Sequence, residues 1–90
     1  MVQFEWDPEK AARNLAKHGV SFTEASTSFG DPLSITIADP THSRLEERFV
    51  LFGLSERGRL LAVAHVDRDG TTRIINARLA TRHERQQYES

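Results

Sequence analysis

The sequence predicts one α+β domain, in which an antiparallel sheet of four or five strands has helices packed on one face. Helix start and stop signals crowd the first third of the 90-residue chain. From residue 33 onward, apolar residues instead alternate or run continuously, as they do in strands. Links of hairpin length join the later strands, which favours antiparallel neighbours. We therefore expect the element order β-α-α-β-β-β-β-α, within a single domain over residues 1–90.

A short strand at residues 2–6 and a helix are expected first. Asp7 is a favourable N-cap, and Pro8 fits the first helical position, where its missing amide costs nothing. The helix is expected to end at His18, because Gly19 readily adopts the left-handed conformation that stops a helix.

A second helix is expected directly afterwards. Ser21 and Glu24 have the S-x-x-E spacing of a capping box, in which each side chain satisfies a free amide of the helix start. A turn at residues 30–32 closes this helix. Its core-facing side chains recur at helical intervals and are Phe22, Ala25, Ser26 and Phe29.

Four strands and one helix complete the predicted fold. A polar loop at residues 40–44 separates the first two strands, and Asp69–Gly70 is a strong hairpin signal before the last. Thr81 and Glu84 have capping-box spacing, so the last helix is expected to start there. The strands are expected at residues 33–39, 47–55, 59–66 and 71–78.

Composition excludes several classes of protein. The chain has no cysteine, and therefore neither disulfides nor thiolate metal sites. The longest apolar run is too short to cross a bilayer and the N-terminus shows no signal-peptide pattern, so we expect a cytoplasmic protein without a membrane partner. The four histidines, at positions 18, 42, 65 and 83, lack metal-site spacing, and we expect neither a metal ion nor another cofactor.

Charge is distributed unevenly along the chain. Residues 1–47 carry four basic and eight acidic side chains, whereas residues 57–85 carry seven arginines and three acidic side chains. This polarity predicts one face for an anionic partner. The acidic first half argues against indiscriminate coating of nucleic acid.

The closing stretch concentrates four arginines within thirteen positions: Arg73, Arg78, Arg82 and Arg85. A guanidinium is a planar fork of donors that matches phosphate oxygens, so one interpretation is a site for a phosphodiester. The alternative, which charge alone favours, is that these arginines are solvated or paired with carboxylates. Strand alternation also sends Arg73 and Arg78 to opposite faces, unless Arg78 lies beyond the end of its strand.

Several segments, in order along nearly the whole chain, resemble the BrnT toxins of bacterial type II toxin–antitoxin systems. The most specific are KHGVSF, which starts at Lys17, and the closing R-I-I-x-A-R-x-A-T-x-x-E-R-x-x-Y, from Arg73 to Tyr88. The others are FEWDPEKAARNLAKHGVSFTEA, FGDP and EERFVLFGLSERGRLLAV.

The resemblance implies a fold similar to the RelE-like ribonucleases and an RNA-cleaving activity that arrests translation. It also implies a cognate antitoxin with a ribbon-helix-helix DNA-binding part, which neutralises the toxin in a heteromeric complex that represses its own operon. We expect the DNA contacts of such a complex to come from the antitoxin, because this chain has neither a helix-turn-helix nor a ribbon arrangement.

Metal-independent cleavage of RNA uses the 2′-hydroxyl as the nucleophile and leaves a 2′,3′-cyclic phosphate. The protein has to orient that hydroxyl, stabilise charge on the phosphoryl oxygens and move protons. We expect Arg73 and Arg78 to hold the scissile phosphate. The candidates for proton transfer, which the sequence does not rank, are His18, Glu84 and Tyr88. The residues expected to aid RNA docking are Lys17, Arg82 and Arg85. Helix capping by His18 and Glu84 and core packing by Tyr88 are the alternatives.

Two other classes of function stay open. A non-catalytic binding module would use the arginine-rich face to dock RNA or an acidic partner without turnover. A purely structural partner would have its arginines covered by an acidic, initially disordered segment of an antitoxin-like chain. Activity of the isolated chain separates both from a ribonuclease.

Overall fold

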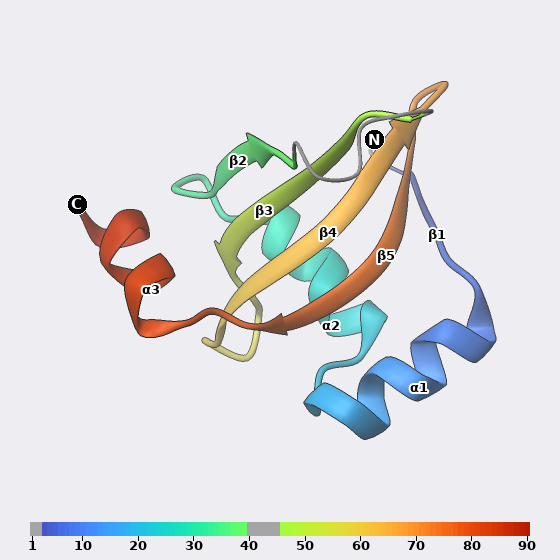
Figure 1. Ribbon diagram of the computed structural model, residues 1–90, viewed down its shortest axis with the longest axis horizontal. Helices are drawn as coiled ribbons and strands as arrows, with labels where there is room; N and C mark the ends of the chain where they lie inside the picture. The colour runs from blue at the N-terminus through green and yellow to red at the C-terminus, as the bar shows by residue number, and fades with distance from the viewer. Residues whose placement is uncertain (1–2, 40–45) are drawn as a thin grey trace.

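The computed structural model describes residues 3–39 and 46–90, which form a five-stranded sheet and three α-helices (Figure 1). The predicted order of elements is confirmed, and the polar loop expected at residues 40–44 lies outside the described residues. In chain order the elements are β1 (Gln3–Glu5), α1 (Pro8–His18), α2 (Phe22–Thr27), the short 3-10 helix η1 (Ser28–Gly30), β2 (Ile35–Ala38), β3 (Arg48–Leu54), β4 (Leu60–Arg68), β5 (Thr71–Leu79) and α3 (Arg82–Glu89).

The sheet is mixed, with the strand order β1-β5-β4-β3-β2. Strands β2 to β5 are antiparallel to one another, as their short links predict. The expectation of a purely antiparallel sheet is wrong for β1, which pairs in parallel with β5 and sets Glu5 opposite Arg73. A parallel neighbour requires a long connection, and the chain from α1 to β4 supplies it.

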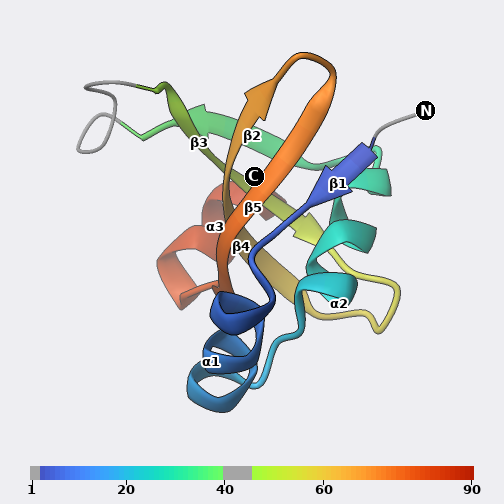
Figure 2. The ribbon, with the colours of Figure 1, turned by 90° about the vertical axis from the view of Figure 1, so that its right-hand side faces the viewer.

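The helices lie on both sides of the sheet, whereas the sequence predicted one side (Figure 2). Phe22 and Ala25 of α2 pack onto one face, together with Leu61 and Val63 of β4. Helix α3 instead shares a hollow with Phe52 of β3 and two β2 side chains. Phe52 lies opposite Ala62 in the register, so its side chain points away from the face of Leu61 and Val63.

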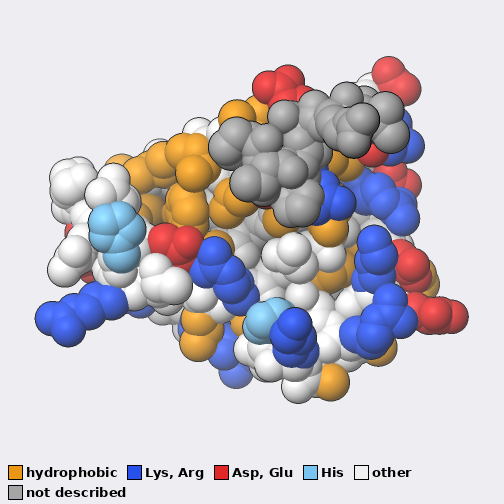
Figure 3. All heavy atoms as spheres, in the orientation of Figure 1, with side chains coloured by type: hydrophobic (Ala, Val, Ile, Leu, Met, Phe, Trp, Pro, Cys, Tyr) orange, Lys and Arg blue, Asp and Glu red, His pale blue; other side chains and the backbone are white. Residues whose placement is uncertain are grey.

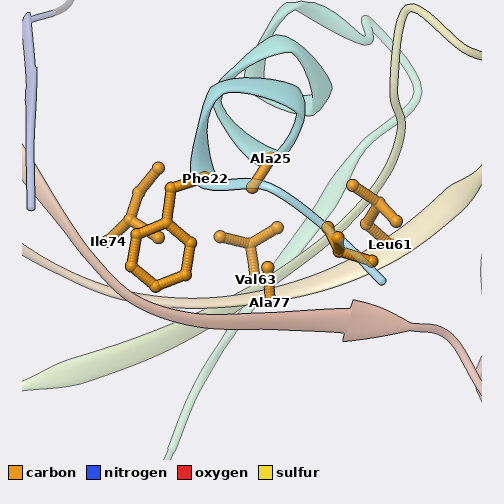
Figure 4. Packing of buried hydrophobic residues seen from close by; sticks show 7 residues of the cluster. Phe22, Ala25, Leu61, Val63, Ile74 and Ala77 are labelled. Atoms are coloured by element: carbon orange, nitrogen blue, oxygen red, sulfur yellow. The ribbon is translucent and has the colours of Figure 1, made fainter. Parts of the chain in front are cut away.

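The main core lies between α2 and the centre of the sheet (Figure 4). Phe22 is 1 % exposed, and each fully buried side chain of this size stabilises the fold by about 1.5–3 kcal/mol. Phe4, Trp6, Ala11 and Phe29 pack around this cluster as partly buried neighbours. The buried side chains of the cluster are Val20, Phe22, Ala25, Leu61, Val63, Ile74 and Ala77.

A β-bulge interrupts β5 halfway along its length. Ala64 of β4 lies opposite Asn76, but the next residue, His65, lies opposite Ile74. Ile75 is therefore an extra residue on β5. Compared with a regular strand, the side chains that follow Ile75 point to the opposite faces relative to those that precede it.

The bulge brings Arg73 and Arg78 to the same face of the sheet. Their partners on β4 are Val66 and Ala62, which are four residues apart and so share a face. A shared face was expected from the sequence only if Arg78 lay beyond the end of its strand. Arg78 instead lies within β5. The geometric objection to their joint action is thereby removed.

Ser21 caps α2 as predicted, but Glu24 does not complete the capping box. The Ser21 side chain accepts from the Glu24 amide at 2.9 Å. The buried Glu24 carboxylate instead accepts from Arg59 Nε at 2.9 Å and from Ser55 Oγ at 2.8 Å. The Arg59 hydrogen bonds lower the pKa of Glu24, so this carboxylate stays ionised and joins α2 to the β3–β4 connection.

Candidate nucleic-acid interface

One face of α1 carries a row of cationic and polar side chains. Lys10, Arg13, Asn14, Lys17 and His18 follow one another at helical spacing, which places them along one side of the helix. The last two lie in the final turn, where the helix dipole favours cations, and Gly19 ends the helix with a φ of 69°.

Asn14 fixes this face of α1 against β5. Its buried Nδ2 donates to the Ala77 carbonyl at 2.8 Å and to the Val20 carbonyl at 3.0 Å. Its Oδ1 accepts from the Ala77 amide at 3.1 Å. β1 pairs only with Thr71–Arg73, so no strand covers this edge of β5 at Ala77 among the described residues. There the Asn14 side chain makes the main-chain hydrogen bonds that a neighbouring strand would otherwise make. The two hydrogen bonds to Ala77 join α1 to β5 and set the separation of these elements.

A hollow of about 600 Å³ lies between α1 and β5. Among the described residues, no carboxylate lines it, so its cations produce a positive potential. Figure 3 shows Lys and Arg side chains gathered on this side of the molecule, whereas hydrophobic side chains gather toward β2. The lining residues are Lys10, Arg13, Asn14, Lys17, His18, Ile75, Asn76 and Arg78.

Arg78 is held by a carboxylate of α3. Its Nη1 donates to Glu84 Oε1 at 2.7 Å and its Nη2 to Glu84 Oε2 at 2.9 Å. Glu84 Oε1 also accepts from the Thr81 amide at 2.8 Å, which completes the predicted capping box. These bonds, chiefly those from Arg78, lower the pKa of Glu84 to about 2. Glu84 is therefore ionised at neutral pH, and it occupies the guanidinium fork that a phosphate would also use.

Arg73 shares the sheet face of Arg78 but is not among the residues that line the hollow. Its Nη1 lies 3.6 Å from Glu5 Oε2, and both side chains are more than a third exposed. An ion pair of this length and exposure is weak, so the guanidinium can exchange Glu5 for another anion.

Tyr88 points to the turn before β2 and not into the hollow. Its hydroxyl donates to Asp31 Oδ2 at 2.6 Å, and this hydrogen bond raises the pKa of Tyr88. Asp31 also accepts from the amides of Leu33 and Leu54, both within 2.9 Å. Tyr88 therefore stays protonated and fastens α3 to this turn.

The two arginines of α3 are exposed and also lie outside the hollow. Arg85 Nη1 is 3.6 Å from Glu89 Oε2, one helical turn away. Of the residues expected from the sequence, the hollow thus brings together Lys17, His18 and Arg78, with Glu84 joined to them through Arg78. Arg82 and Arg85 lie apart from these.

Sequence reasoning missed five residues of the hollow, namely Lys10, Arg13, Asn14, Ile75 and Asn76. The spacing of Lys10 and Arg13 relative to Lys17 on a predicted helix was sufficient to find the first two. Asn76 could not be placed, because its direction depends on the bulge at Ile75.

Among the described residues, no three side chains of the His, Cys, Asp and Glu types are grouped so that they could hold a metal ion. None of the helices in the described ranges is long and apolar enough to cross a membrane.

The fold and the hollow define a small α+β protein with an open, cationic site suited to anionic ligands. The family described as the ribonuclease toxin, BrnT, of the type II toxin–antitoxin system matches residues 6–84. The chain belongs to this family of ribonuclease toxins. Membership implies RNA as the substrate and an antitoxin as the partner.

A solved structure agrees with this assignment at the level of the fold. The chain is similar to the 1.1 Å crystal structure of the Brucella abortus ribonuclease toxin BrnT, with a TM-score of 0.66 and 21% sequence identity. The match covers 91% of this chain and 100% of that chain. None of the curated proteins matches the chain. The relation to RelE-like ribonucleases stays a prediction.

Proposed function

We propose that the chain cleaves RNA at the hollow between α1 and β5, without a metal ion, and thereby arrests translation. The observation that carries this proposal is the group of cations that lines the hollow: Lys10, Arg13, Lys17 and Arg78, with His18 beside them. Cations fixed around one hollow can stabilise the charge that grows on the phosphoryl oxygens.

Arg78 is the proposed contact of the scissile phosphate. Its guanidinium already holds the two oxygens of Glu84, and a phosphate offers the same pair of acceptors. RNA binding then requires Arg78 to exchange Glu84 for the phosphate. The α1 cations favour this exchange because they attract the incoming phosphate, and the pair of Arg13 with Glu9 is too long, at 3.8 Å, and too exposed to cancel that attraction.

His18 is the proposed base. It lines the hollow, and a neutral imidazole has a ring nitrogen that can accept a proton. Glu84 is less suited, because both of its oxygens accept hydrogen bonds and its pKa is about 2. Tyr88 is less suited because it donates to Asp31 and its pKa is raised.

The reaction balances with these groups. Neutral His18 accepts the proton of the 2′-hydroxyl, the 2′-oxygen forms a bond to phosphorus, and the bond from phosphorus to the 5′-oxygen breaks. Water supplies the proton to the 5′-oxygen, and the hydroxide that remains takes the proton from His18, which restores the neutral base. The products are a 2′,3′-cyclic phosphate and a free 5′-hydroxyl.

The other arginines are proposed to dock RNA. Arg73 lies along the same sheet face as Arg78, where it can meet a neighbouring phosphate of the same strand. Arg82 and Arg85 are exposed on α3 and can hold RNA more loosely. We further propose that the toxin acts in the cytoplasm, and that an antitoxin with a ribbon-helix-helix part neutralises it and carries the DNA contacts of an autorepressing complex.

The test is incubation of the purified, partner-free chain with mixed RNA, with and without EDTA, followed by mapping of the RNA ends. Cleavage that survives EDTA and leaves cyclic phosphates is the expected result. Cleavage that EDTA abolishes contradicts the metal-independent mechanism. Intact RNA bound by the folded chain, with affinity that falls as salt rises, moves the assignment to a non-catalytic binding module.

A further inference from the structure

All four arginines of the described strands project from the same face of the sheet. Arg73 and Arg78 share the face that points away from α2, and Val66 of β4 lies opposite Arg73. Arg48 of β3 also lies opposite Val66, so it points to this face as well. Arg68 follows Val66 by two residues on β4 and completes the set. Figures 1 and 3 view the molecule from this side, with α2 behind the sheet and Lys and Arg side chains around the centre of the face.

Arg48 differs from the other three because it has no carboxylate partner among the described residues. Its side chain makes no hydrogen bond or ion pair within the described ranges, even with Asp39, whose amide donates to the Arg48 carbonyl at 2.8 Å. Arg48 is also partly exposed. Its guanidinium can therefore bind an incoming anion without first giving up a carboxylate. The three pairs of the other arginines are Arg68–Glu46, Arg73–Glu5 and Arg78–Glu84.

Arg48 and Arg73 lie on either side of Val66. They are two strands apart, so their backbones are separated by about 9–10 Å. Val66 between them is buried and has no polar side-chain group, and the long arginine side chains can lean over it from both flanks. Since the pair of Arg73 with Glu5 is weak, both guanidiniums are available to one anion.

This pair of arginines lies apart from the hollow, and neither of them lines it. The β4 partners of Arg73 and Arg78 are four residues apart, which corresponds to about 13 Å along the strand. A phosphate held by Arg78 and a phosphate held by Arg48 and Arg73 are therefore different phosphates. One RNA strand can supply both, because its backbone carries a phosphate at every nucleotide.

We propose that Arg48 and Arg73 form a second phosphate site, which binds the RNA backbone away from the bond that is cleaved. The substrate is then an RNA strand long enough to reach from the hollow to Val66. A dinucleoside monophosphate fills the hollow but lacks the second contact. This inference rests on the proposed cleavage of RNA in the hollow.

The experiment compares Arg48→Gln, which keeps most of the side-chain length but removes the charge, with Arg68→Gln. Arg68 is a matched control, because it lies on the same face but donates to Glu46 through Nε and Nη2. Fluorescence anisotropy measures the affinity for a 2′-O-methyl RNA of about ten nucleotides at several salt concentrations. Circular dichroism checks folding, and Arg48→Ala replaces Arg48→Gln if the latter does not fold.

We expect Arg48→Gln to weaken RNA binding by about three- to tenfold. The slope of log affinity against log salt should fall in magnitude by about 0.7, the contribution of one phosphate contact to a single strand. Arg48→Lys, which keeps the charge, should retain the wild-type slope, and Arg68→Gln should change neither quantity. Unchanged affinity and slope in folded Arg48→Gln overturn the proposal.

Cleavage of a dinucleoside monophosphate separates the second phosphate site from the hollow. Its single phosphate has to lie in the hollow to be cleaved, so Arg48→Gln should cleave it as the wild type does. For the ten-nucleotide RNA with free 2′-hydroxyls, KM should rise by about three- to tenfold with kcat unchanged. Equal losses with both substrates overturn the proposal, because Arg48 would then act at the hollow. If the wild-type chain cleaves no RNA but Arg48→Gln still loses affinity and slope, the proposed activity fails and the second phosphate site stands.

Discussion

Arg78 of β5 and Glu84 of α3 form a bidentate ion pair, with distances of 2.7 and 2.9 Å between guanidinium nitrogens and carboxylate oxygens. The cation best placed to hold a phosphate is thus already occupied by a carboxylate of the same chain. If Arg78 holds the phosphate of RNA as proposed, RNA and Glu84 compete for one guanidinium, and this competition makes the role of Glu84 testable.

Glu84→Gln should strengthen RNA binding by about two- to fivefold, because it removes a negative charge that competes with phosphate. Fluorescence anisotropy with a 2′-O-methyl RNA, which lacks the nucleophile, measures this affinity without cleavage. Glu46→Gln is the control, since Glu46 pairs with Arg68 outside the hollow. Loss of RNA cleavage by Glu84→Gln with unchanged affinity would instead identify Glu84 as the base.

The same pair should make stability depend on pH. The pKa of Glu84 is about 2 in the folded chain, against an ordinary value of 4.5. Below about pH 5 the unfolded chain therefore binds a proton that the folded chain does not, and stability falls as the pH is lowered toward 2. The contribution is on the order of 2–3 kcal/mol.

Glu24 and Asp31 also have lowered pKa values and act in the same direction. The difference between wild type and Glu84→Gln isolates the contribution of one carboxyl. Urea unfolding at pH 7, 5 and 3 should show a smaller loss of stability in Glu84→Gln than in wild type. Equal losses in the two proteins would show that Glu84 is not the group that titrates.

Asn14→Ala should weaken both the fold and RNA binding. The change leaves the Ala77 amide and carbonyl without their side-chain partner at a buried site, which costs on the order of 2–3 kcal/mol. Because Asn14 sets the separation of α1 and β5, RNA affinity should fall even where the variant is fully folded. Asn76→Ala is the control, because it removes an amide side chain from the other wall of the hollow. An equal loss of RNA affinity in Asn76→Ala would show that the loss of any amide from the hollow explains the effect of Asn14→Ala. Urea unfolding measures the stability, and RNA affinity is measured at a temperature well below the melting point. An unchanged RNA affinity of folded Asn14→Ala would contradict a positioning role for Asn14.

Tyr88→Phe should cleave RNA at the wild-type rate. The hydroxyl is engaged by Asp31 at 2.6 Å and does not line the hollow, so its removal should lower the free energy of unfolding by about 1 kcal/mol or less. Single-turnover cleavage and thermal unfolding separate these effects. A drop in the cleavage rate of the folded variant would restore Tyr88 as a candidate for proton transfer.

Local signals in the sequence predicted the elements well. Asp7, Gly19, Ser21 and Thr81 mark helix ends through their own side chains or backbone, so their effect can be read without knowledge of the tertiary structure. The Thr81–Glu84 capping box formed as predicted, because both of its partners lie within one helical turn.

Non-local relationships were the ones that the sequence did not predict. β1 pairs in parallel with β5 across more than sixty residues, and nothing local marks that pairing. Glu24 left its capping position because Arg59, which lies 35 residues away, offers a stronger partner in a buried site. The shared face of Arg73 and Arg78 depends on a bulge whose position is set by pairing with β4. Of the five site residues that the hollow gathers on α1, only Lys17 and His18 were predicted, although Lys10 and Arg13 stand at helical spacing in the same segment.

The most direct test of the account is the single-turnover rate of RNA cleavage by partner-free Arg78→Ala, compared with Arg68→Ala. Arg68 is a matched control, because it also pairs with a glutamate but lies at the far end of β4 and outside the hollow. We predict a loss of about 10²- to 10³-fold for Arg78→Ala, the usual effect of removing one preorganised donor to a transition-state oxygen, and a rate near wild type for Arg68→Ala. Cleavage by folded Arg78→Ala at the wild-type rate would contradict the assignment of the hollow as the site of reaction.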